Sequence, residues 1–188
     1  GEILTSGHVA ARELSKRGVQ KAYVAGESGM VNEIQEQGIE ITEDAEHAVL
    51  GFDRNFNYSK LEKIRNIACE NGEVFVCSTE KIFQRSEKSQ PHQKALNSAI
   101  REFSNPELAG KPGDMYRRHF KRYFSYFPGQ SAFIGDRLAD VKTGNSLGMT
   151  TALVMNGATT EEELRKAEEK EVPDYALTSL HKLRRRII

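Results

Sequence analysis

Hydrophobic residues along this chain occur in two patterns: short runs, typical of strands, and longer stretches with the spacing of amphipathic helices. The short runs are rich in Val, Ala, Phe and Leu and do not alternate cleanly with polar residues, which is typical of parallel strands covered on both faces. The predicted strands lie at residues 21–26, 47–52, 73–79, 131–136, 150–156 and 174–178. Since helical stretches separate them, the pattern predicts an α/β fold with a parallel sheet.

The predicted helices fill the intervals, at residues 7–17, 28–37, 58–71, 91–103, 112–127, 138–147, 160–170 and 179–186. Four glycines stand where a helix would end in a left-handed cap: Gly18, Gly38, Gly72 and Gly148. Thr159 or Thr160, followed by EEEL, is typical of a helix start with a capping box. The polar segment 78–93 has no clear period, and we expect a loop there, either over a site or simply at the surface.

Composition narrows the class of protein. The 188 residues suffice for one sizeable core, or for a core with an inserted subdomain. Lys plus Arg and Asp plus Glu both number 27, so the net charge is zero and no global field favours nucleic acid or a membrane surface. The apolar runs are too short to span a bilayer, and the N-terminus does not read as a signal peptide. We expect a cytoplasmic protein whose Cys69 and Cys77 are reduced, buried thiols, with a metal-binding pair or a disulfide as the alternatives.

Two carboxylates follow the predicted strand 131–136, in the sequence GDRLAD. Ligands of open parallel sheets bind beyond the carboxyl ends of the strands, where Asp136 lies. Mg²⁺ prefers oxygen ligands, and Asp140, one helical turn later, can face the same cavity directly or through a water. The pattern indicates a magnesium site, although acids that cap local structure would have the same spacing. Arg137 pairs with one of these acids, caps local structure, or binds the substrate.

A lysine that suits a phosphate group lies upstream, in the sequence AGKPGDMY. Lys111 precedes a proline that is well suited to the first position of a helix, so its ammonium would stand near a helix N-terminus, where anions bind. There it can neutralise phosphate oxygens, with a solvated surface lysine as the alternative. One βαβ-sized step separates Lys111 from Asp136, so both are expected at the same edge of the sheet.

The remaining motifs indicate structural rather than functional roles. The stretch YRRHFKRYFSYF at 116–127 interleaves basic and aromatic residues, but its aromatic residues fall mainly on one helical face. It therefore predicts an amphipathic helix rather than a nucleic-acid surface. The five histidines lack the spacing of a zinc site, and neither a GxSxG elbow nor a phosphate-binding loop occurs. We expect neither nucleic acid nor a membrane as a partner.

Five stretches, in this order, carry a resemblance to a known family: EILTSGHVAARELSKRGVQKAYVAGESGM, AVLGFDRNFNYSKLEKI, GKPGDMY, FIGDRLADVKTGNSLGMTTALVMNGATTEEEL and VPDYALTSLHKL. The chain resembles the haloacid dehalogenase-like phosphatases of subfamily IIA, the NagD and p-nitrophenylphosphatase type, over nearly its whole length. This resemblance implies a Rossmann-like parallel-sheet core, incomplete at the N-terminus, with a large inserted α/β cap. It implies core segments at 1–19 and 108–188 and a cap at 20–107.

The same resemblance implies a Mg²⁺-dependent phosphatase that hydrolyses a small phosphorylated metabolite through an aspartyl-phosphate. It makes Lys111 the catalytic lysine that faces the phosphate, Asp136 the metal-binding acid and Asp140 its supporting or water-mediated partner. The sequence GDRLAD has one residue fewer between its acids than is usual in the family, and the cap loop that helps to select the substrate also differs. The resemblance therefore does not imply a particular phosphate ester.

The nucleophilic aspartate of the family belongs to a DxDG motif, which none of the six aspartates of this sequence forms. We therefore expect this chain alone to be inactive. Either it belongs to a phosphatase whose N-terminal part lies outside this sequence, or it is a catalytically inactive relative that serves in binding or assembly. Missing core strands would expose apolar edges, so we also expect marginal stability, a homo-oligomer, or pairing with the absent segment.

Overall fold

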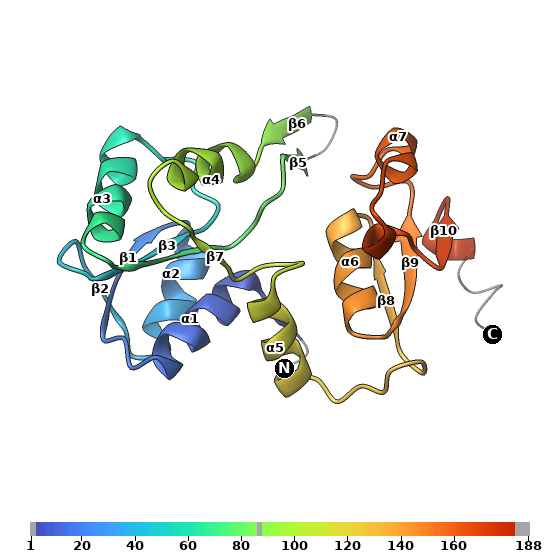
Figure 1. Ribbon diagram of the computed structural model, residues 1–188, viewed down its shortest axis with the longest axis horizontal. Coiled ribbons are helices and arrows are strands. Elements are labelled where there is room, and N and C mark those ends of the chain that lie inside the picture. The colour runs from blue at the N-terminus through green and yellow to red at the C-terminus, as the bar shows by residue number, and fades with distance from the viewer. Residues whose placement is uncertain (1–2, 86–87, 183–188) are drawn as a thin grey trace. The chain divides into compact units, whose positions relative to one another are not determined.

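The structure is a computed structural model that describes residues 3–85 and 88–182, without the side chains of 82–90. The chain divides into two compact units, one within residues 1–120 and the other within 121–188 (Figure 1). In the described part of the chain, no helix combines the length and the apolar character that a membrane span requires.

Within the described residues, a five-stranded parallel sheet organises the first unit, in the order β2-β1-β3-β4-β7 (Figure 1). Its strands are β1 Lys21–Ala25, β2 Glu40–Ile41, β3 His47–Leu50, β4 Glu73–Val76 and β7 Glu107–Leu108. The chain passes from β1 outward to β2 and then returns to the opposite side of β1 for β3. The strand order therefore reverses between β1 and β3, and such a switch point is where open α/β sheets bind ligands.

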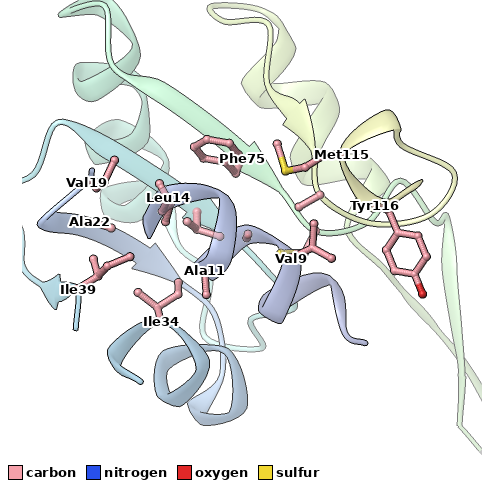
Figure 2. Close-up of a cluster of buried hydrophobic side chains, with 14 residues drawn as sticks. Val9, Ala11, Leu14, Val19, Ala22, Ile34, Ile39, Phe75, Met115 and Tyr116 are labelled. Carbon is pink, nitrogen blue, oxygen red and sulfur yellow. The ribbon is translucent and has the colours of Figure 1, made fainter. Parts of the chain in front are cut away.

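Helices cover both faces of this sheet: α1 Ser6–Lys16, α2 Ser28–Gln35, α3 Tyr58–Cys69, α4 Lys94–Arg101 and α5 Asp114–Tyr123. One core cluster joins α1, α2 and α5 to the sheet, and Figure 2 shows Leu14, Ile34 and Phe75 within it. On the other face, Ile64 of α3 and Ile100 of α4 pack with sheet residues and are fully buried. The prediction of strands covered on both faces is confirmed for this sheet.

The helix α1 belongs to the packing of the first unit. Thr5 caps its start, because the Thr5 side-chain oxygen accepts a hydrogen bond from the His8 backbone N–H at 2.9 Å. Its apolar face, which includes Val9 and Leu14, is fully buried in the same cluster as Phe75 of β4. The domain boundaries expected at residues 19/20 and 107/108 stay predictions.

The second unit is built on a three-stranded parallel sheet, in the order β10-β9-β8 among the described residues (Figure 1). Its elements are β8 Ala132–Gly135, α6 Leu138–Ser146, β9 Thr150–Val154, α7 Glu161–Arg165, the 3₁₀ turn η1 Glu169–Glu171, β10 Tyr175–Leu177 and the 3₁₀ turn η2 Leu180–Lys182. The helix α6 approaches the sheet closely, since a methyl group on Gly144 would collide with Phe133 and Thr151. Asp174 fixes the start of β9, accepting hydrogen bonds from the backbone N–H (2.7 Å) and the hydroxyl (3.1 Å) of Thr151.

The six predicted strands are confirmed as β1, β3, β4, β8, β9 and β10, whereas the short strands β2 and β7 were not expected. The segment 78–93 is not simply a loop, because it contains an antiparallel hairpin of β5 Ile82–Arg85 and β6 Lys88–Pro91. The helix expected at 112–127 ends at Tyr123, and the one expected at 160–170 divides into α7 and η1. Residues 183–186 of the last predicted helix lie outside the described residues.

The expected left-handed glycine caps are confirmed at Gly18, Gly38 and Gly148, with φ of 76°, 76° and 69°. The prediction for Gly72 is wrong, because Asn71 takes the left-handed conformation there, with φ of 67°. Gly72 has a different role: a side chain at this position would collide with the Glu46 carbonyl oxygen. Cys69 is also exposed rather than buried, while Cys77 is buried as expected.

Candidate functional site

Asp136 directly follows β8 and is held by the loop after β9. Its Oδ2 accepts a hydrogen bond from the Ala158 backbone N–H at 3.0 Å, and its carbonyl oxygen accepts one from the Thr159 N–H at 3.0 Å. Gly157 permits this close approach, because a side chain there would collide with the Asp136 carboxylate. The partly exposed carboxylate therefore lies at the carboxyl ends of the adjacent parallel strands β8 and β9, and the predicted position at a strand end is confirmed.

Asp140 lies in the first turn of α6 and is only 5% exposed. Its Oδ2 accepts a hydrogen bond from the Arg137 backbone N–H at 3.2 Å, and Arg137 is the extended N-cap residue of the helix. Asp140 therefore caps the start of α6, which is the structural alternative that the spacing of the two acids left open. A role for Asp140 in metal binding, and a contact between Arg137 and a substrate, stay predictions.

We expect the substitution Gly135→Ala to destabilise the protein, because the new methyl group would collide with the Asp140 side chain. The loss of unfolding free energy should be about 1–3 kcal/mol, as for other overpacked sites, and urea unfolding measures it. Gly29→Ala is the matched control, since nothing lies within 4 Å of a methyl group at that position. A Gly135→Ala protein as stable as the wild type would show that Asp140 is not packed against this strand end.

Lys111 belongs to the first unit and follows β7. The Ala109 N–H donates to the Val76 carbonyl oxygen at 2.9 Å, which continues the pairing of β7 with β4. A turn then joins Gly110 to Gly113, whose N–H donates to the Gly110 carbonyl at 2.8 Å, and α5 begins at Asp114. Pro112 is thus not the first helical residue, and it follows a cis peptide bond.

The donor set in the second unit suits magnesium better than zinc. Among the described residues, no three His, Cys, Asp or Glu side chains cluster in a way that could hold a metal ion. Structural zinc needs four protein ligands, whereas Mg²⁺ is commonly held by one or two carboxylates together with waters and substrate phosphate. Asp136 and Asp140 would supply such carboxylates. Because Lys111 belongs to the other unit, its expected convergence with Asp136 stays a prediction.

One feature of the first unit was not anticipated from the sequence. A cavity of about 400 Å³ lies beyond the carboxyl ends of β1, β3 and β4, with Glu27, Phe52 and His92 among its lining residues. The phenyl ring of Phe52 and the imidazole ring of His92 are stacked, with centroids 5.4 Å apart. The available signal was the residues that follow these strands, such as Glu27, Phe52 and Ser78, but their convergence depends on the strand order.

Comparisons with known proteins agree with this architecture. A family model described as HAD-hydrolase-like matches residues 108–183. The 5'-nucleotidase YutF of Bacillus subtilis (strain 168) is 27% identical over 185 residues, which cover 95% of this chain and 71% of that protein. Ribonucleotide monophosphatase NagD of Escherichia coli (strain K12) is 26% identical over 164 residues, 85% of this chain and 64% of that protein.

Solved structures match over most of the chain. A crystal structure of 4-nitrophenylphosphatase from Thermotoga maritima has a TM-score of 0.85 and 28% identity, covering 98% of this chain and 72% of that one. Glycerol phosphate phosphatase Rv1692 from Mycobacterium tuberculosis, in complex with magnesium, has a TM-score of 0.80. Its 20% identity, over 96% of this chain and 57% of that one, shows a common fold.

Fold, motif order and relatives together define a HAD-like hydrolase. Within that superfamily, the chain belongs to the NagD and p-nitrophenylphosphatase type, subfamily IIA. It is homologous to phosphatases of the superfamily that act on small phosphate monoesters. The family resemblance stated from the sequence is confirmed.

Proposed function

We propose that this chain supplies the metal-binding acid and the phosphate-binding lysine of a Mg²⁺-dependent phosphatase that hydrolyses a small phosphate monoester. The position of Asp136 carries this proposal: its carboxylate is anchored at the carboxyl edge of a parallel sheet by the Ala158 N–H and remains partly exposed. In the overall reaction the P–O bond to the alcohol breaks and a P–O bond to a water oxygen forms. A proton from that water leaves with the alcohol.

Each assigned residue has a separate task. Asp136 would hold Mg²⁺, with Asp140 as a direct or water-mediated second acid. When bound, Mg²⁺ would neutralise charge on the phosphate oxygens and orient the group. The Lys111 ammonium would neutralise further phosphate charge and reduce its repulsion of an anionic nucleophile, and Arg137 would bind the substrate. We assign no residue of this sequence as that nucleophile.

The two sheets would correspond to two functional parts. We propose that the five-stranded sheet of the first unit forms the inserted cap, and that the three-stranded sheet of the second unit belongs to a Rossmann-like core. The fold of the relatives and the family model over residues 108–183 support this division. The proposed substrate is a small phosphorylated metabolite.

The test is hydrolysis of 4-nitrophenyl phosphate by the full-length gene product that contains this sequence. We expect turnover that EDTA abolishes and Mg²⁺ restores. Lys111→Ala should lower kcat by about 100-fold or more, because one charge-stabilising donor is lost, whereas the exposed Lys121→Ala should leave kcat unchanged. A full-length protein that is inert towards aryl phosphates would favour the alternative, an inactive relative used for binding or assembly.

A further inference from the structure

The cavity of the first unit lies where a parallel sheet most often binds a ligand. Its walls include Glu27 after β1, Phe52 after β3 and Cys77 after β4. These strand ends flank the switch point between β1 and β3, at which the strand order reverses. Its volume of about 400 Å³ suits a small molecule.

The floor of the cavity is apolar and adaptable. The thioether of Met30 lies between Gly26 and Gly51, where a side chain on either glycine would collide with it. The Met30 sulfur lies 3.6 Å from the Cys77 sulfur. Burial raises the pKa of the Cys77 thiol to about 12, so that this thiol stays neutral and acts as an apolar wall. Methionine fits ligands of different shape because its side chain is unbranched and flexible.

The charged groups at the cavity are acidic. Glu27 and Glu33 line it, and the described lining residues include neither lysine nor arginine. The Arg54 guanidinium stands outside the lining and contacts both carboxylate oxygens of Glu27, with its Nε 3.1 Å from Oε1. His8 Nδ1 lies 2.8 Å from Glu33 Oε2 and is also outside the lining. Among the described lining residues, a ligand inside the cavity therefore contacts two carboxylate groups and neither a lysine nor an arginine side chain.

One wall is flat and aromatic. The rings of Phe52 and His92 are inclined by only 22°, and the guanidinium carbon of Arg54 lies 5.5 Å from the centre of the Phe52 ring. Such a wall suits a ring or a short methylene chain.

The cavity also adjoins the segment that carries Lys111. A methyl group on Gly110 would stand 3.4 Å from Ser6 Cβ and would collide with the Cys77 carbonyl oxygen. Both Ser6 and Cys77 line the cavity, so the chain just before Lys111 packs directly on its wall. A phosphate bound at Lys111 could therefore carry an alcohol that reaches into the cavity.

We propose that this cavity binds the alcohol part of the substrate, and that it favours phosphate esters of uncharged or amine-bearing alcohols over esters that carry a carboxylate. This inference rests on the proposed function, because Lys111 would hold the phosphate. A carboxylate entering the cavity would lose its hydration and face two acids, whereas an ammonium would gain their attraction. The aromatic wall would hold the carbon skeleton of either ligand equally, so charge decides the choice.

A binding experiment without phosphate tests the cavity alone. Tyramine and 3-(4-hydroxyphenyl)propionate share a phenol ring but end in an amine and a carboxylate. We expect tyramine to shift the backbone NMR signals of Gly29, Gly51 and Ser78, and to bind at least about tenfold more tightly than the acid. Glu33→Gln and Glu27→Gln should each reduce this preference, while Glu36→Gln, an exposed residue that does not line the cavity, should not. Equal affinities, or shifts away from these residues, would overturn the proposal.

Kinetics on the full-length gene product distinguish the charge preference of the cavity from the phosphatase function. We expect kcat/KM for the phosphate ester of tyramine to exceed that for the phosphate ester of 3-(4-hydroxyphenyl)propionate by at least about tenfold. Equal values for the two esters would overturn the charge selection and leave the phosphatase function standing. Absence of hydrolysis of both esters by a protein that hydrolyses 4-nitrophenyl phosphate would overturn the assignment of the cavity to the substrate, whereas absence of hydrolysis of all three esters would overturn the phosphatase function itself.

Discussion

Asp136→Asn is expected to lower kcat/KM of the full-length protein for 4-nitrophenyl phosphate by about 1,000-fold or more. The amide is neutral and offers a single acceptor oxygen, so it cannot replace a carboxylate as a ligand of Mg²⁺. That oxygen can still accept the hydrogen bond that Ala158 N–H now donates to Asp136, so the strand end should keep its structure. Steady-state kinetics at several Mg²⁺ concentrations measure the effect, and calorimetric Mg²⁺ titration measures the metal affinity.

Asp44→Asn is the matched control for this prediction. The Asp44 side chain is 95% exposed, and its ion pair with Lys21 is long, at 3.4 Å. The same change of charge at this position should leave both kcat/KM and Mg²⁺ affinity unaltered. Full activity of Asp136→Asn, with unchanged Mg²⁺ affinity, would remove Asp136 from the metal site.

Glu13→Ala is expected to lower the free energy of unfolding by about 3 kcal/mol, because it removes one partner from a buried ionic cluster. The Glu13 side chain is 5% exposed, and its Oε2 lies 2.9 Å from His119 Nε2 of α5. Its Oε1 accepts a hydrogen bond from Arg17 at 3.1 Å, and Arg17 also binds Glu73 and Glu107 at the amino ends of β4 and β7. The substitution would leave His119 and Arg17 without their shared partner. Chemical denaturation measures the loss, and the exposed Glu36→Ala should change stability by no more than about 0.5 kcal/mol.

The same cluster predicts a dependence of stability on pH. Burial by itself would raise the pKa of Glu13, but hydrogen bonds from His119 and Arg17 outweigh burial and hold the pKa below its ordinary value of 4.5. The folded carboxyl group therefore binds protons less readily than the unfolded one. Its contribution to stability is fully present above pH 4.5 and is lost as the pH falls through the lower, folded value. We expect wild-type stability to fall more steeply below pH 4.5 than that of Glu13→Gln; parallel curves would contradict the assignment.

Local rules predicted the strands and most helix ends, because those features depend on neighbouring residues. The six short apolar runs formed strands, and in the sheet of the first unit burial on both faces accounts for their continuous apolar sequence. The hairpin of β5 and β6 was missed because its residues are polar and lack the apolar alternation of a half-buried strand. The left-handed residue after α3 was misplaced by one position, and the helix ends at Cys69, two residues before the expected end at Asn71. Asn71 and Gly72 both tolerate a left-handed backbone, and the close approach of the Glu46 carbonyl, remote in sequence, requires glycine at position 72.

In the candidate site, too, features that depend on neighbouring residues could be predicted, whereas features that depend on residues remote in sequence could not. The position of Asp136 at a strand end could be predicted, because it follows from the apolar run before it. Its anchoring by Ala158 and the need for glycine at position 157 could not, because they depend on a loop from the next strand. The cavity of the first unit depends on β1 lying beside β3, and the order of strands in a sheet is not encoded in any one segment.

A crystal structure of the full-length gene product with Mg²⁺ and inorganic phosphate is the most direct test of the central claim, that Lys111 and Asp136 serve one phosphate group. The account predicts Mg²⁺ bound to an oxygen of Asp136 and of the phosphate, with the Lys111 ammonium in hydrogen-bond contact with the same anion. A metal ion bound elsewhere, or a phosphate held by Asp136 and its metal while Lys111 points into solvent, would contradict it.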